Sequence, residues 1–256
     1  MKKSELLTSA LVLFLCIALF TGCGSSSTST NNNQPASTNT KSSNQDAVEI
    51  VASGAYVSDL NGGYSTSPDP VGNVYCEYKN NSSQTIQLTS LDADFMDASG
   101  TVLSSSYTIY APKTLAPGET GYAGAMRYNG SGITMDVQPT VKFKPVYKTV
   151  ASVDNPLKVE DVQVVSEGSY GGDVNNQIVQ VTVSNSSSEE ISTFTIVVGL
   201  YDSEGNLIGV AKQSMGSNPI PANGKAIEDC DDLVLQSDDL STVASLDARV
   251  DNTSAY

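Results

Sequence analysis

The sequence contains no histidine and no tryptophan, and it has only 4 cysteines among 256 residues. Without histidine the chain has no imidazole to ligate zinc, and no Ser/His or Cys/His pair for nucleophilic catalysis. Basic residues are also scarce, because 13 Lys and Arg face 28 Asp and Glu, which gives a formal net charge of −15. Affinity for nucleic acid comes largely from cations that neutralise phosphates, so no nucleic-acid partner is expected.

Charged residues of both signs make up only 16% of the chain, so Ser, Thr, Asn, Gln and Gly must supply most of its polar surface. Ser, Asn and Gly disfavour helices, which makes the composition typical of a β-rich protein. The sequence also lacks a G-x-S-x-G motif, a Gly-rich phosphate loop and a C-x-x-C pair. We therefore expect a protein that is not an enzyme and needs no cofactor.

The N-terminus has the pattern of an export signal. Two lysines precede an unbroken apolar run from Ala10 to Phe20, which is shorter than the roughly 20 residues of a membrane-spanning helix. The run leads through Thr-Gly to Cys23 and resembles the lipobox of bacterial lipoproteins. The resemblance implies that residues 1–22 are a signal peptide and that Cys23 receives diacylglycerol. The alternatives are an ordinary secretory signal with an incidental cysteine and an uncleaved anchor.

Two acyl chains on Cys23 would hold the protein stably on the outer face of the cell membrane, because one chain alone gives only marginal binding. Residues 23–47 then form a stretch of Ser, Thr, Asn and Gln with almost no apolar side chains. Such a stretch cannot bury enough surface to offset its ordering entropy. We expect it to be a disordered tether between the lipid bilayer and a folded part.

The remaining chain contains an internal repeat. At an offset of 105, Val74–Ser83 aligns with Val179–Ser188, and Asp97 and Gly100 align with Asp202 and Gly205. Further along, the Leu-Ala-Pro-Gly-Glu segment that begins at Leu115 resembles the segment from Ile220 to Lys225 with one extra residue in the second copy. Upstream, an alignment at offset 114 places Val51, Gly54 and Tyr56 over Val165, Gly168 and Tyr170. The two offsets together predict a nine-residue insertion within 57–72 of the first copy.

Each copy has the period-two pattern of β-strands. Val179, Val181 and Val183 alternate with polar residues, and the apolar residues from Phe194 to Leu200 alternate with Thr195 and Gly199, which predicts one buried and one wetter face. Turn signals divide each copy into about seven short strands. We predict two tandem immunoglobulin-like β-sandwich domains at 48–149 and 157–254, joined by 150–156.

The Asp-x-x-Gly segments at Asp97 and Asp202 are interpreted as hairpin turns. The Asp carboxylate can accept a hydrogen bond from the backbone two residues on, and Gly supplies the positive φ. In the second copy the strand into this turn carries Val198, Leu200, Tyr201 and Asp202, which resembles the F-x-L-Y-D signature of bacterial FxLYD domains, with Val198 in place of Phe. That resemblance implies a sandwich fold in a surface or lipoprotein context and no catalytic residues.

The cysteines and the acidic residues are two further candidates for functional sites. Cys76 is interpreted as a small core residue and Cys230 as a separate buried or isolated thiol among acids, with a disulfide between the two domains or a redox role as the alternatives. An acidic run of Glu228, Asp229, Asp231 and Asp232 has the oxygen chemistry that calcium prefers, yet alternation along a strand would send neighbouring acids to opposite faces. We interpret this run as a solvated sheet edge, and we regard calcium there, or at Asp92, Asp94 and Asp97, as the less favoured alternative.

The tyrosines raise the question of glycan binding. Sugars stack on exposed aromatic rings, and the candidates concentrate in the first copy, namely Tyr56, Tyr64, Tyr107, Tyr110, Tyr122 and Tyr128. Tyrosine is also a good strand residue that packs its ring and wets its hydroxyl, and we favour that structural role. The sequence thus predicts a membrane-anchored, non-catalytic interaction or structural protein of the cell envelope with an envelope protein or glycan as partner. The alternative is a lipoprotein that binds envelope glycan or a divalent cation.

Overall fold

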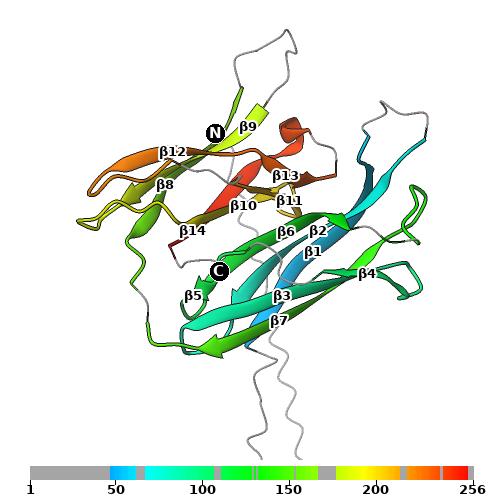
Figure 1. Ribbon diagram of the computed structural model, residues 1–256, viewed down its shortest axis with the longest axis horizontal. Coiled ribbons are helices and arrows are strands. Elements are labelled where there is room, and N and C mark those ends of the chain that lie inside the picture. Colours follow the sequence, from blue (N-terminus) through cyan, green and yellow to red (C-terminus); the bar gives the residue numbers. More distant parts are fainter. Residues whose placement is uncertain are drawn as a thin grey trace, which may run out of the picture. The chain divides into compact units, whose positions relative to one another are not determined.

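A computed structural model describes residues 47–61, 67–106, 111–128, 130, 132–152, 154–166, 177–213, 218–236 and 239–252. Over these residues the chain is all-β, as predicted, with one short 3-10 turn, η2 (Leu240–Thr242), and no α-helix (Figure 1). None of the described segments is a helix that could cross a bilayer. The predicted signal peptide, Cys23 and all but the last residue of the predicted tether lie outside the described residues.

Within its described residues, the first repeat contains seven strands, all paired antiparallel. They are β1 (Val48–Asp59), β2 (Pro70–Asn80), β3 (Ile86–Met96), β4 (Val102–Ser106), β5 (Thr114–Leu115), β6 (Thr120–Tyr128) and β7 (Thr140–Thr149). One sheet has the order β1-β2-β6, and in the other β3 lies between β4 and β7 and also pairs with β5. The two sheets form a sandwich that lies within the predicted limits 48–149.

The second repeat has a matching arrangement, except that one strand is added and an isolated bridge between Ile191 and Ile220 stands in place of the pairing of β3 with β5. Its strands are β8 (Leu157–Ser166), β9 (Gln177–Asn185), β10 (Thr195–Tyr201), β11 (Leu207–Lys212), β12 (Lys225–Cys230), β13 (Asp232–Leu235) and β14 (Ser245–Asp251). One sheet has the order β8-β9-β12, matching β1-β2-β6, and the other has the order β14-β10-β11-β13. Directly after Cys230, the last residue of β12, the chain leaves the first of these sheets. It then forms the added strand β13, which pairs with β11 in the other sheet.

Each sandwich encloses its own apolar core. In the first, Val74, Cys76 and Tyr78 alternate along β2 and face Phe95 and other side chains of β3. In the second, the predicted alternation of valines along β9 is confirmed, and these side chains face Val198 and Leu200 of β10. Each fully buried Leu or Val stabilises the fold by about 1.5–3 kcal/mol relative to its exposed state.

Two buried asparagines show how closely the copies match. Asn80 donates its side-chain amide to the carbonyls of Gln84, Leu115 and Ala116 at 2.8, 3.0 and 3.1 Å. The amide of Asn185 donates at 2.7, 3.2 and 3.3 Å to carbonyls that follow at the same spacing, those of Glu189, Ile220 and Pro221. Each asparagine therefore joins the end of one strand to two loops, and the sequence pattern had identified these positions only as turns.

The offset of 105 also holds for β6 and β12, the third strands of the matching sheets β1-β2-β6 and β8-β9-β12. Thr120 pairs with Lys79, and Lys225 pairs with Ser184. Gly118 has φ +78°, and Asn223, which lies 105 residues on, has φ +50°. The predicted extra residue in the second copy is therefore wrong, because Asn223, rather than Gly224, occupies the left-handed position of Gly118.

The upstream alignment at offset 114 is also wrong. Val48 pairs with Asn80, and Leu157 pairs with Asn185, so β1 and β8 correspond at an offset of 109. A β-bulge after Ile50 and another after Val159 confirm this register. The first copy is therefore longer by four residues, not nine. The Gly and Tyr matches that suggested offset 114 involve residues 168 and 170, which follow the described part of β8.

Candidate functional site

The outward face of one sheet in each repeat is buried against the other repeat. A third apolar cluster lies there, separate from the two cores, with Tyr56 and Tyr122 from the first repeat and Val197, Val210 and Val234 from the second. Each of these side chains is 6% exposed or less. The prediction of a wetter second face for β10 is therefore wrong: β10 is buried on both faces because the first repeat covers Val197 and its neighbours.

Two glycines allow the sheets to approach closely. A Cβ atom on Gly199 of β10 would lie 2.5 Å from Cε1 of Tyr122, which is closer than real carbon atoms pack. A Cβ atom on Gly124 of β6 would overlap Cγ2 of Val210 in the same way. Packing this tight leaves no room for even one additional methyl group at either position. The contact between the repeats thus has the density of a protein interior at these two points.

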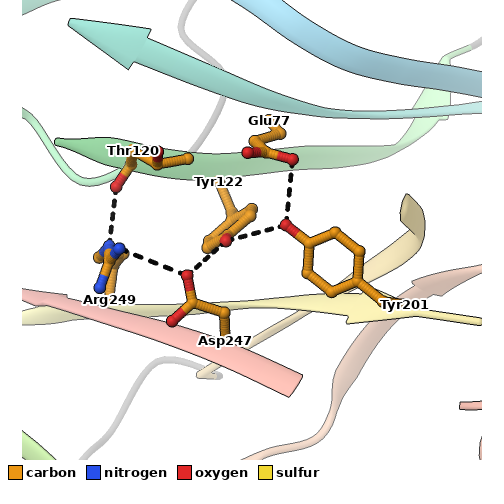
Figure 2. A network of polar contacts seen from close by, with 6 residues as sticks. All are labelled: Glu77, Thr120, Tyr122, Tyr201, Asp247 and Arg249. Carbon is orange, nitrogen blue, oxygen red and sulfur yellow. Dashed lines mark hydrogen bonds and ion pairs between the residues drawn. The ribbon is translucent and has the colours of Figure 1, made fainter. Parts of the chain in front are cut away.

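A chain of polar contacts lies beside this cluster (Figure 2). The Tyr122 hydroxyl donates to Asp247 Oδ2 at 2.6 Å. The proton of the Tyr201 hydroxyl is shared between Glu77 Oε2 at 3.0 Å and the Tyr122 oxygen at 2.9 Å. The two rings meet edge to face, with an angle of 82° between their planes and 6.3 Å between their centres. The chain of contacts therefore alternates between the repeats, from Glu77 to Tyr201, Tyr122 and Asp247.

Arg249 holds the Asp247 end of this chain in place. Its guanidinium lies 3.3 Å from Asp247 Oδ2, and its Nε donates to the Thr120 carbonyl of the first repeat at 2.8 Å (Figure 2). Further along β14, the buried carboxylate of Asp251 accepts the backbone N–H groups of Lys113 and Thr114 at 2.7 and 2.8 Å. Strand β14 therefore bonds to the first repeat along its length.

The hydroxyls of Tyr122 and Tyr201 are held in their neutral form. Burial, followed by the hydrogen bond to Asp247, raises the pKa of Tyr122 far above its ordinary value. Burial and the Glu77 carboxylate raise the pKa of Tyr201 to about 12. Both hydroxyls therefore keep their protons across the physiological range and act as hydrogen-bond donors in these contacts.

The four motif residues have distinct positions. Val198 and Leu200 are fully buried in the core of the second repeat. Tyr201 faces the opposite way and reaches the first repeat. Asp202 closes the following turn, where its Oδ1 accepts the N–H groups of Glu204 and Asn206 at 2.9 Å each. The motif thus contributes to the core, the contact between repeats and a hairpin turn.

The interpretation of the Asp-x-x-Gly segments is confirmed. Asp97 Oδ1 accepts the N–H groups of Ser99 and Thr101 at 2.9 Å each, as Asp202 does in the second repeat. Gly100 has φ +85° and Gly205 has φ +83°. Both turns therefore use Asp and Gly for the reasons that turn chemistry requires.

The acidic run is divided between different surroundings. Asp229 is exposed and accepts the Gln180 amide at 2.9 Å, Asp231 is exposed, and Asp232 lies 3.1 Å from Lys212 Nζ. The interpretation of a fully solvated edge is wrong for Glu228, which is only 3% exposed and accepts the Gln213 amide at 2.7 Å. Among the described residues, no group of three or more acidic or cysteine side chains is placed to share a metal ion.

In the first repeat, the carboxylates of Asp94 and Asp97 form hydrogen bonds or ion pairs with nearby residues. Asp94 forms an ion pair with Lys144 and accepts the Ser105 hydroxyl at 2.8 Å. The hydrogen bond from Lys144 is the main cause that lowers the pKa of Asp94. Asp97 is engaged in its turn. Both therefore have structural partners that account for their positions.

The cysteines are separate, as favoured from the sequence. Cys76 lies in the core of the first repeat and Cys230 in that of the second, both fully buried and free. Burial raises the pKa of Cys230 to about 12 and that of Cys76 well above its ordinary value. Neither thiol therefore forms the thiolate that redox or metal chemistry needs.

The structural role favoured for the tyrosines is confirmed at two of the six positions, since Tyr56 and Tyr122 are buried between the repeats. Tyr64, Tyr107 and Tyr110 and the side chain of Tyr128 lie outside the described residues.

Comparison with known proteins leaves the family open. No protein-family model matches this chain, and no curated protein matches it significantly.

Proposed function

We propose that this protein is a lipid-anchored, non-catalytic lipoprotein of the cell envelope, in which the two sandwiches act together as one rigid interaction module. The observation that carries the proposal is the buried contact between the repeats, where apolar packing and the Glu77–Tyr201–Tyr122–Asp247 contacts join both domains. Interfaces between domains that move freely are more polar and less closely packed. A module of this kind presents surfaces of both domains in a fixed relation to a partner.

Two properties of the chain support the non-catalytic part of the proposal. The motif tyrosine and its neighbours are neutral donors that hold the repeats together. The buried thiols are kept protonated by their surroundings. These four side chains thus have structural roles, two in the contact between the repeats and two in the cores.

The anchoring part of the proposal rests on the sequence pattern that ends at Cys23. It is tested by expressing the full chain in a bacterial host and labelling it with an alkynyl fatty acid. Cys23→Ser should remove the label and release the protein from the membrane fraction. Cys16→Ser is the matched control, because Cys16 lies within the predicted signal peptide, and it should leave labelling unchanged. Equal labelling of the two variants would overturn the assignment of Cys23.

The rigid-module part is tested by the distance between spin labels at Ser83 in the first repeat and Ser203 in the second, both exposed turn residues. A single narrow distance distribution is expected for the docked repeats. A broad distribution at neutral pH would show that the domains move independently, and it would remove the main support for a fixed display of both surfaces.

A further inference from the structure

An open pocket lies where the repeats meet, next to the polar contacts described above. Its volume is about 530 Å³, and it is lined by Tyr75 from the first repeat and by Asp202, Ile208, Leu235, Gln236 and Thr242 from the second. Ligand sites commonly lie at junctions between domains and have volumes in this range. Because its wall comes from both repeats, this pocket exists only while they remain docked.

The lining combines an apolar wall with hydrogen-bond acceptors. Tyr75, Ile208 and Leu235 supply a ring and two aliphatic side chains. The polar groups are a carboxylate on Asp202, an amide on Gln236 and a hydroxyl on Thr242, and all of them can accept a hydrogen bond. Lysine and arginine side chains have a matching composition, since an aliphatic stem ends in a group that only donates.

The charge of the pocket points the same way. Asp202 is the charged residue among the described residues of the lining, and hydrogen bonds from the Asn206 side chain and from backbone N–H groups lower its pKa. The carboxylate is therefore ionised at neutral pH, and Glu204 stands two residues away. Burial raises the pKa of Tyr75, so its ring remains neutral and able to contact a cation through its face. On a chain with net charge −15, this site attracts cations and repels anions.

We propose that this pocket between the repeats binds a lysine or arginine side chain presented by a protein partner. The inference deepens the proposed function and rests on it, since it names the chemistry of the partner for the rigid two-domain module. Asp202 and Tyr75 hold the cationic end, and Ile208 and Leu235 contact the aliphatic stem. The FxLYD-like aspartate then has two roles, closing its turn and recognising the cation.

The test uses the mature chain with Cys23→Ser and a defined probe, an acetylated and amidated Gly-Arg-Gly peptide. Its neutral isostere, with citrulline in place of arginine, is the matched ligand control. Titration followed by amide NMR shifts should show saturable changes at Asp202, Ile208 and Gln236 with the arginine peptide. Citrulline should bind about fivefold more weakly, which is the upper end of the effect of one partly exposed charge pair.

Two variants test whether the charge on Asp202 is responsible for binding. Asp202→Asn keeps the acceptor oxygen that closes the turn and removes the charge, so it should weaken binding about fivefold. Asp97→Asn makes the same change in the matching turn of the first repeat and should leave binding unchanged. Gln236→Glu adds a second carboxylate at an exposed position and should tighten binding, which keeps the test decisive if Asp202→Asn unfolds.

Equal shifts from the citrulline peptide, equal effects of the two Asp→Asn changes, or no saturable shift at the pocket would each overturn the inference. Shifts at these residues with di-N-acetylchitobiose instead of the arginine peptide would also overturn it, in favour of glycan. None of these outcomes affects the labelling of Cys23 or the distance between the repeats. Failure of the pocket and failure of the proposed function are therefore distinguishable.

Discussion

The hydroxyl of Tyr201 lies 2.9 Å from the hydroxyl of Tyr122, so the motif tyrosine of the second repeat ends on a buried tyrosine of the first. Tyr201 also reaches Glu77 on the neighbouring strand. One side chain thus contacts both a phenol and a carboxylate of the other domain.

Tyr201→Phe should therefore lower the free energy of unfolding by about 1–2 kcal/mol. The change removes the hydroxyl that donates to Glu77 and Tyr122, so these two partly buried oxygens lose a hydrogen-bond donor. Urea denaturation followed by circular dichroism measures the change. Tyr75→Phe is the matched control, since it removes a hydroxyl of the same outward face without loss of a described hydrogen bond. Equal costs for the two variants would contradict the importance of the Tyr201 contacts.

Gly199→Ala should destabilise the contact between repeats by about 1–3 kcal/mol, because the added methyl group would overlap the Tyr122 ring. The control is a double-mutant cycle. In a Tyr122→Ala background the methyl group has room, so the same glycine change should cost much less. If Gly199→Ala costs as much with Tyr122→Ala as without it, Gly199 is required for a different reason.

The paired asparagines give a prediction that applies to both domains. Asn185→Asp replaces an amide that donates to three carbonyls by an oxygen that repels them, and it should cost about 2–4 kcal/mol at pH 7. Asn80→Asp should cost about as much in the first repeat. Ser188→Asp adds the same charge at an exposed site in the same turn and should have little effect. A small loss of urea stability for either asparagine variant would refute this role.

The sequence predicted most of the fold because strand periodicity and turn chemistry are local. Valines at alternate positions of β9 and Asp-x-x-Gly turns require no knowledge of distant residues. The contact between repeats is different, since Tyr122 and Asp247 are 125 positions apart and neither has an unusual local pattern. One signal was available: Ile196 to Leu200 is a continuous apolar segment, which is typical of a strand buried on both faces.

The candidate pocket was not predictable for the same reason. Tyr75 and Gln236 come from different repeats, and only the docking of the two sandwiches brings them to one cavity. The acidic run illustrates the opposite error. Alternation was expected to send neighbouring acids to opposite faces and does expose Asp229, but the face that carries Glu228 is buried rather than solvated.

The two core thiols should be unreactive in the folded protein. In a chain with Cys16→Ser and Cys23→Ser, a maleimide should label neither Cys76 nor Cys230 without denaturant, and it should label both in urea. The reason is that full burial blocks access and raises both pKa values, so that little thiolate forms. Mass spectrometry counts the labels. A native adduct, or a mass lower by two hydrogens, would reveal an accessible thiol or a disulfide.

Glu228 should make stability depend on pH. Burial raises the pKa of this carboxyl in the folded state, and the neighbouring Asp229 acts in the same direction. The folded chain therefore holds the proton more tightly than the unfolded chain does, whose carboxyl titrates near pH 4.3. The contribution of Glu228 is most favourable below that value and is lost as the pH rises through the folded pKa.

Glu228→Gln keeps the shape of the side chain and removes the charge, while its carbonyl can still accept the Gln213 amide. It should raise the free energy of unfolding by about 1 kcal/mol at pH 8 and change it little at pH 4. Urea titrations at the two pH values measure the difference. Glu190→Gln, at an exposed position, removes the same charge and controls for the net charge of the chain. If both variants gain equally at pH 8, general repulsion rather than the burial of Glu228 causes the dependence.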